Sequence, residues 1–319
     1  MKLPMLRIGD RIPRFPFVQG GMAVRISTAV LAAAVAEAGG VGTIAGTGMS
    51  PDELRSEIRE ARRLTTGIIG VNVLFAVTQF ADLVKTAIME KVDFVVSGAG
   101  FSRDMYTWGR EGGVPILPIV SSARLARAAE RLGASAIVVE GAEAGGHLGT
   151  DRPIREIVPE VRGVTGLPVI AAGGIADGRE AADLFELGAD GVQVGTRFIA
   201  SEECTAPSDF KMMHVATRPE DMVLVNSPVG LPGRAIRNPF WERVVKGENL
   251  EPDGCRGCLK QCSHRFCILD ALRRAQQGDV GNGLVFSGLS ALRIKSILPV
   301  GEIMRLLAAG ESESFALST

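Results

Sequence analysis

One pattern repeats through the first two hundred residues and limits what the chain can fold into. Short runs of β-branched and other apolar residues end in glycine or a polar residue, and stretches with apolar residues at spacings of three and four follow them. The runs predict eight strands, at residues 17–22, 41–46, 68–74, 94–100, 116–120, 136–141, 169–174 and 191–197. Helices are expected between them, including 28–38, 51–64, 78–90, 122–132 and 178–187.

Eight strand–helix units in succession are what a (β/α)8 barrel requires. The alternative is a doubly wound open sheet, whose dinucleotide turn places a Gly-x-Gly fingerprint between the first strand and the first helix. The segment Gln19-Gly20-Gly21-Met22 follows the first strand but lacks that spacing. The sequence therefore predicts an α/β fold of the TIM-barrel type.

The alternation stops near residue 205, and proline, glycine, arginine and cysteine accumulate beyond it. We expect a barrel over residues 1–208 and an inserted, mainly helical cap over 209–285 at the mouth of the barrel. Residues 286–319 are expected to form closing helices that pack on the barrel.

The charge balance limits the partners. The formal net charge is −1, from 35 basic and 36 acidic side chains, which argues against binding to nucleic acid or to an anionic membrane surface. No apolar run approaches the ~18 residues of a membrane span, and the N-terminal segment lacks the apolar centre of a signal peptide. We therefore expect a cytoplasmic protein, and a homodimer is an option that the sequence leaves open.

The seventh and eighth predicted strands both have glycine at or near their carboxyl ends. The former ends in Gly173-Gly174, and the latter in Gln193-Val194-Gly195-Thr196. Glycine lets backbone N–H groups approach a phosphate closely, and the loops after these two strands are the usual phosphate site of barrels. The alternative is that the glycines only permit tight turns.

A histidine, His147, follows the sixth predicted strand in the glycine-rich segment 140–149. A histidine in a loop at this end of a barrel has little core to pack into, and its ordinary pKa near 6.5 suits proton transfer at neutral pH. Met22 and Asn72 lie at the ends of the first and third predicted strands. Met22 suits contact with a flat ring, and Asn72 offers both a donor and an acceptor, although a core methionine and a turn asparagine are the alternatives.

Four cysteines fall within thirteen residues: Cys255, Cys258, Cys262 and Cys267. Such a cluster in a cytosolic chain indicates a metal site, and thiolates select zinc or iron–sulfur centres. Zinc sites usually pair two Cys-x2-Cys units across a longer spacer, so the compact spacing favours a [4Fe–4S] cluster over zinc. His264 could replace one thiol, and a set of free cysteines is the remaining alternative.

Five motifs occur in order: Gln-Gly-Gly-Met, Gly-Val-Asn-Val-Leu, Glu-Ala-Gly-Gly-His-Leu-Gly, Ala-Ala-Gly-Gly-Ile-Ala-Asp-Gly and Gln-Val-Gly-Thr-Arg-Phe. Together, over residues 15–240, they resemble the nitronate monooxygenase (2-nitropropane dioxygenase) superfamily, which includes FMN-dependent enoyl-acyl-carrier-protein reductases. The resemblance implies a barrel with a cap and non-covalent FMN. It implies His147 as the acid/base. The cofactor-binding residues expected from it and from the strand ends are Gly21, Met22, Asn72, Gly146, Gly173, Gly174, Gln193, Gly195 and Thr196.

The cysteine arrangement resembles that of a branch of the same superfamily, the bifunctional acyl-carrier-protein dehydrogenase/isomerase of unsaturated fatty-acid synthesis. That branch pairs FMN with a [4Fe–4S] cluster bound by cap cysteines. The first two spacings match, whereas the last is shorter here, which sets Cys267 apart from the other three.

The resemblance implies an FMN-dependent oxidoreductase that acts on acyl thioesters, either as free small molecules or bound to an acyl carrier protein. NADH or NADPH could serve as co-substrate. Residues 234–274 contain nine basic and five acidic side chains, which would steer an acidic carrier protein, or would instead balance a thiolate cluster. The alternative activity is a nitronate monooxygenase that uses O2, and a third is a non-catalytic redox sensor.

Overall fold

The computed structural model describes residues 2–252 and 254–313, so residues 314–319 of the expected closing segment lie outside the described residues. Eight parallel strands close into a barrel, because β1 pairs with both β2 and β9. The predicted barrel is confirmed, and all eight strands lie where they were expected. They are β1 (Phe17–Gln19), β2 (Val41–Ala45), β3 (Ile68–Leu74), β4 (Phe94–Gly98), β5 (Ile116–Val120), β6 (Ile137–Glu140), β8 (Val169–Ala172) and β9 (Gly191–Val194).

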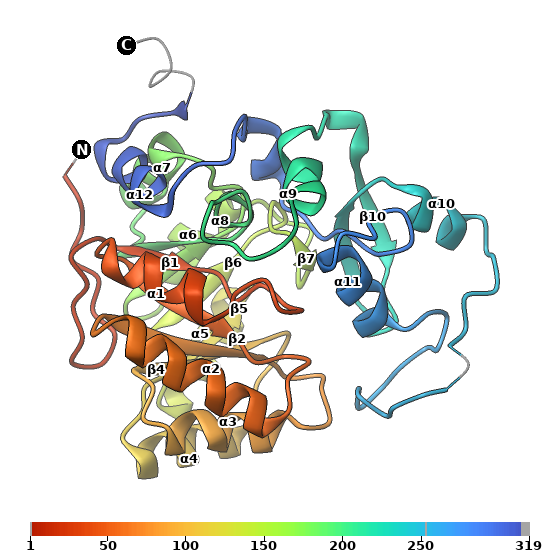
Figure 1. Ribbon diagram of the computed structural model, residues 1–319. Helices are drawn as coiled ribbons and strands as arrows, with labels where there is room; N and C mark the ends of the chain where they lie inside the picture. The colour runs from red at the N-terminus through yellow and green to blue at the C-terminus, as the bar shows by residue number, and fades with distance from the viewer. Residues whose placement is uncertain (1, 253, 314–319) are drawn as a thin grey trace.

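Helices surround the barrel (Figure 1). Local sequence explains where several begin: Ser50 and Glu53 form a capping box at the start of α2, with Pro51 in the first turn, and Asp177 and Glu180 do the same for α7. The five helices expected by range are present, and α4, α6 and the short α8 add three more. The helices are α1 (Ala29–Glu37), α2 (Pro51–Leu64), α3 (Phe80–Met89), α4 (Arg103–Gly112), α5 (Ala123–Leu132), α6 (Ile154–Arg162), α7 (Gly178–Glu186) and α8 (Thr196–Ile199).

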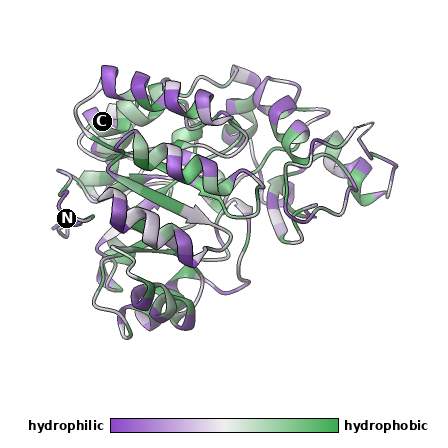
Figure 2. Cartoon of the chain, turned by 90° about the horizontal axis from the view of Figure 1, so that it is seen from below, coloured by the Kyte–Doolittle hydropathy of each residue, from purple (hydrophilic) through white to green (hydrophobic). Residues whose placement is uncertain are grey.

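The barrel interior is filled at the amino ends of its strands. Leu6 and Ile8 of the N-terminal arm are buried there against Val18, Phe94 and Leu117 of the strands. Figure 2 shows apolar strands enclosed by helices whose outward faces are largely hydrophilic. Because this end is plugged by side chains, a ligand can enter the barrel from the opposite end, where the strands have their carboxyl ends.

The region after the barrel strands is mainly helical, as expected, and it also contains a short antiparallel sheet. It contains the helices α9 (Ser208–Val215), α10 (Pro239–Val245) and α11 (Ile268–Gln276), but also a hairpin of β10 (Met222–Asn226) and β11 (Pro232–Ile236). β11 pairs with β7 (Gly146–His147), in the loop after β6, to make a three-stranded antiparallel sheet. The strands of this hairpin are short, and their pairing with β7 joins segments about ninety residues apart, so local periodicity could not predict the sheet.

The described C-terminal segment returns to the barrel through the 3-10 helix η2 (Leu289–Arg293) and α12 (Val300–Ala309). A buried ion pair of 2.8 Å joins Arg197, directly after β9, to Glu313. Glu313 also accepts hydrogen bonds from Lys295 N and from the Ser296 hydroxyl. This network fixes the last described residues beside α8. Within the described ranges, no helix combines the length and the apolar character needed to cross a membrane.

Candidate active site

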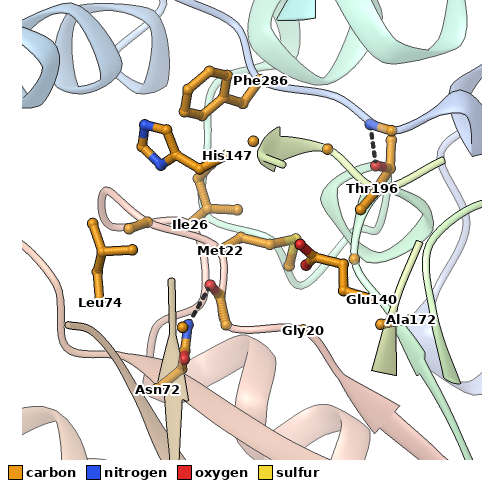
Figure 3. Close-up of a pocket in the computed structure, with 18 of the residues that line it drawn as sticks. Gly20, Met22, Ile26, Asn72, Leu74, Glu140, His147, Ala172, Thr196 and Phe286 are labelled. Carbon is orange, nitrogen blue, oxygen red and sulfur yellow. Dashed lines mark hydrogen bonds between the residues drawn. The ribbon is translucent and has the colours of Figure 1, made fainter. Parts of the chain in front are cut away.

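A cavity of about 230 Å³ opens at the carboxyl ends of the barrel strands, beneath the cap (Figure 3). The barrel supplies its floor, and the loop after β6, the cap hairpin, α11 and residues 286–290 supply its walls. The ten residues predicted to bind cofactor or to act as acid/base all line this one cavity. They are Gly21, Met22, Asn72, Gly146, His147, Gly173, Gly174, Gln193, Gly195 and Thr196.

One end of the cavity is formed by main chain in close approach. Gly173 and Gly174 have φ angles of 112° and 78°, which favour glycine, and a Cβ on Gly173 would lie 3.0 Å from the Ala144 nitrogen. A Cβ on Gly145 would lie 2.5 Å from the Gly288 nitrogen. Gly288 N–H in turn donates to Thr196 Oγ1 at 3.0 Å. This end therefore offers backbone and hydroxyl groups without side-chain bulk, as anion-binding loops do.

A second part of the cavity has hydrogen-bond acceptors without donors. Asn72 Nδ2 donates to Gly21 O at 3.0 Å, and a Cβ on Gly21 would lie 2.3 Å from Asn72 Cβ, so glycine is required there (Figure 3). Asn72 Oδ1 and Gln193 Oε1 are buried and have no hydrogen-bond partner among the described residues. Such unpaired acceptors are costly, so a ligand that brings N–H or O–H donors is favoured at this place.

His147 lies between Phe286 and the side chains of Ile26 and Met22 (Figure 3). Its Nε2 is 2.8 Å from Ser227 Oγ, and its ring meets that of Phe286 edge to face at 5.1 Å. Burial lowers the pKa of His147 to about 4. The imidazole is therefore neutral at physiological pH.

Glu140, at the end of β6, is the other titratable side chain among the described residues that line the cavity. Its carboxyl group has no hydrogen-bond or ion-pair partner within the described ranges. Burial raises the pKa of Glu140 to about 8. The two groups are thus shifted in opposite directions, and both are predominantly uncharged at pH 7.

Replacing Glu140 with glutamine is expected to stabilise the ligand-free protein at pH 8 by about 1–2 kcal/mol. This is less than the full pKa shift would give, because water that enters the open cavity weakens the desolvation of the carboxylate. The raised pKa means that the folded wild type holds its proton while the unfolded chain loses it above about pH 4.3. Wild-type stability therefore falls between pH 5 and 8, and the variant lacks this fall. Melting temperatures measured across this range test it, with the exposed Glu186→Gln as control. Equal pH slopes in Glu140→Gln and wild type would contradict it.

The four cysteines lie beside the cavity rather than in it, while Leu259 between them contributes to the wall. Their segment is fixed to the β3–α3 loop, because Thr78 N–H donates to Cys258 O and Lys260 N–H to Ala76 O. Burial and then the neighbouring thiols raise the pKa of Cys258. Within residues 2–252 and 254–313, no three or more His, Cys, Asp or Glu side chains are arranged to hold a metal ion. The expected [4Fe–4S] or zinc site therefore finds no support in the described geometry.

Sequence reasoning missed several residues of the cavity. Glu140 is the first residue of the glycine-rich segment 140–149, and its place at a strand end was the one available signal. Phe286, Gly288 and Ser290 line the cavity, and Ser227 contacts His147 from behind that lining. All four come from segments with no recognisable motif, and only the folded cap brings them to the barrel mouth.

Comparison with known proteins gives the family. The family model described as nitronate monooxygenase matches residues 8–92 and 75–310. A solved structure of FabK from Thermotoga maritima has 38% sequence identity and a TM-score of 0.85, covering 96% of this chain and 95% of that one. A nitroalkane oxidase from Streptomyces ansochromogenes has 26% identity and a TM-score of 0.80, covering 96% and 98%.

A curated relative from Mycobacterium tuberculosis is 33% identical over 235 residues, which are 73% of this chain. It is a (3aS,4S,5R,7aS)-5-hydroxy-7a-methyl-1-oxo-octahydro-1H-indene-4-carboxyl-CoA dehydrogenase, and the match spans 66% of its length, slightly less than two thirds. The relatives that the chain matches bear the names of oxidoreductases, and the chain itself belongs to the nitronate monooxygenase family.

Proposed function

We propose that this protein is an FMN-dependent oxidoreductase of acyl thioesters, working by enoyl reduction or by acyl dehydrogenation and isomerisation, with His147 as the group that acts on the acyl substrate. The observation that carries the proposal is the cap side of the cavity. Aliphatic side chains of the cap line it together, and an acyl chain needs such a wall whereas a small nitroalkane does not. These side chains are Val229, Leu259, Ile268, Leu269 and Leu272.

The residues present fit FMN. The glycine-lined end, with Gly173, Gly174, Gly195 and Thr196, suits a single phosphate. The unpaired acceptors of Asn72 and Gln193 suit the N–H and hydroxyl donors of a flavin and its ribityl chain. When bound, FMN supplies hydride exchange with the β-carbon of an acyl group.

His147 is suited to the substrate carbonyl and α-carbon because its neutral imidazole lies at the boundary between the glycine-rich floor and the aliphatic cap wall. The indene-carboxyl-CoA dehydrogenase is by its name an enzyme of a thioester, which favours this substrate class. Whether the acyl group arrives on coenzyme A or on an acyl carrier protein is the open choice within the proposal. A cytoplasmic location, NADH or NADPH as co-substrate, and a homodimer remain predictions from the sequence.

The second candidate is oxidation of alkyl nitronates with O2. The matched family model and the nitroalkane oxidase neighbour favour it, and the same imidazole and flavin cavity would serve.

The test uses the full chain loaded with flavin. Flavin released by mild denaturation should be FMN, not FAD. Under anaerobic conditions we expect trans-2-enoyl thioesters to be reduced with NADH or NADPH, or saturated acyl thioesters to bleach the flavin. Oxygen uptake with propyl nitronate is measured in parallel. Turnover of nitronates with no reaction of any thioester would overturn the proposal in favour of the second candidate.

We propose separately that Cys255, Cys258, Cys262 and Cys267 bind a [4Fe–4S] cluster, although their side chains in the described structure are not arranged to hold one. The support is their spacing and their gathering beside the cavity. Anaerobically purified protein is then expected to contain iron and to show a broad band near ~400 nm, and Cys258→Ser to lose both while keeping FMN. Iron and zinc analysis of the two proteins checks this. Equal metal content would contradict it.

A further inference from the structure

The cap supplies a hydroxyl group to His147. Ser227 lies in the turn between β10 and β11, is 5% exposed, and has its Oγ 2.8 Å from His147 Nε2. The same hairpin holds the backbone of His147, because β11 pairs with β7 and places Gly233 opposite His147. Backbone and ring of His147 are therefore both fixed by one cap element.

The contacts of Ser227 decide the direction of this hydrogen bond. Its Oγ already accepts the N–H of Val229 at 3.3 Å. Within the described part of the chain, the His147 ring nitrogen is the one acceptor within hydrogen-bonding distance of the hydroxyl hydrogen. If the ring donated instead, that hydrogen would be left without a partner at a buried position, which proteins avoid. The hydroxyl therefore donates to Nε2, and a neutral ring then carries its proton on Nδ1.

The other ring nitrogen is free to meet a ligand. Among the described residues Nδ1 of His147 has no hydrogen-bond partner, and Figure 3 shows one ring nitrogen directed toward the side of the cavity where Ile26 and Met22 lie. Burial keeps the pKa of the imidazole low, so the ring remains neutral while it offers this N–H.

We propose that Ser227 is a positioning residue that holds His147 in the Nδ1–H tautomer, so that the imidazole presents a hydrogen-bond donor to the carbonyl oxygen of the bound acyl group. The substrate part of this inference rests on the proposed function, whereas the tautomer does not. A neutral imidazole N–H stabilises negative charge that builds on that oxygen when the α-hydrogen leaves or arrives. The acid/base assignment of His147 is thereby sharpened: in the resting enzyme it is a donor at Nδ1.

The tautomer can be observed directly, because the chain has three histidines. The full-length protein is labelled with 15N-histidine and studied by NMR with and without FMN, and the His147 signals are assigned with His147→Gln. We expect an Nδ1–H pattern in the wild type, a mixture of tautomers in Ser227→Ala, and recovery of the Nδ1–H pattern in Ser227→Thr. An Nε2–H pattern in the wild type, or an unchanged pattern in Ser227→Ala, would overturn the proposal.

Kinetics provide the second measurement. Ser227→Ala is expected to lower kcat for a thioester about tenfold with little change in KM, while Asn226→Ala, an exposed neighbour in the same hairpin, leaves both unchanged. His147→Asn, whose amide nitrogen can occupy the place of Nδ1, should retain more activity than His147→Gln, whose amide reaches the place of Nε2. The reverse order would count against the donor role. If the tautomers behave as expected but no thioester reacts, the assignment of Ser227 stands and the proposed function fails.

Discussion

Replacing His147 with alanine is expected to lower thioester turnover by ~10²–10⁴-fold while FMN binding is retained, the usual loss when a residue that exchanges or shares a proton with the substrate is removed. The cavity explains the separation of the two effects. The glycine-lined end is formed mainly by residues just after β8, just after β9 and just before η2, whereas the His147 side chain lies on β7 beneath the cap hairpin. Steady-state kinetics together with the flavin content of the same sample measure both.

The control for His147→Ala must show that turnover falls because the imidazole is missing and not because packing is disturbed. His147 also packs against Phe286, so alanine leaves a small void beside that ring. Phe286→Leu tests this packing alone, because it changes the ring contact and keeps the imidazole. We expect it to change turnover far less than His147→Ala does. If turnover of His147→Ala stays within a few-fold of wild type, His147 has no part in the reaction.

The pKa of Glu140 is raised and that of His147 is lowered, so the cavity has an uncharged hydrogen-bonding group on the barrel side and another on the cap side. Glu140 has no partner in the described structure and is protonated near neutrality, so it can donate a hydrogen bond from the barrel floor. His147 is neutral and donates from the cap side if Ser227 holds its tautomer. Two uncharged donors on opposite walls suit a site that must hold a flavin and an acyl carbonyl without fixed charge between them.

The barrel could be predicted from the sequence because the signals for its strands, helices and turns each lie within a short stretch of residues. Each strand is a short apolar run, each helix has its own periodicity and caps, as Ser50 and Asp177 show, and glycines at strand ends indicate where the backbone approaches a ligand. The strand-end residues Asn72 and Gln193 could be assigned to one cavity because a closed parallel barrel brings all its carboxyl strand ends to one face.

The cap could not be predicted in the same way because its contacts are long-range. The sheet of β7, β10 and β11 joins segments about ninety residues apart, and Ser227 meets His147 across 80 residues. Neither residue type nor spacing in the 227–230 turn distinguishes a serine that holds a histidine from one that only forms a turn. The cysteine spacing was locally clear, but spacing alone does not determine how the side chains are oriented.

Gly174→Ala is the substitution expected to affect FMN most. Gly174 has φ 78°, and a Cβ there would lie 3.0 Å from Glu143 Cβ, at the edge of the glycine-lined end. Two effects therefore combine: strain of ~1–2 kcal/mol from the left-handed backbone, and a displaced loop where the phosphate would be held. We expect the dissociation constant for FMN to rise at least tenfold, measured by titrating flavin fluorescence.

The matched control separates the two effects. Gly113 has φ 70° at the end of α4, and a Cβ there would meet nothing within 4 Å. Gly113→Ala therefore carries the same backbone strain far from the barrel mouth and without a crowded Cβ. It should lower the melting temperature, though less than Gly174→Ala does, while leaving FMN affinity unchanged. If both variants bind FMN like the wild type, the phosphate is not held by the loop after β8. If both lose FMN equally, general destabilisation accounts for the loss, because Gly113 shares the backbone strain of Gly174 but neither its contact with Glu143 nor its place at the cavity.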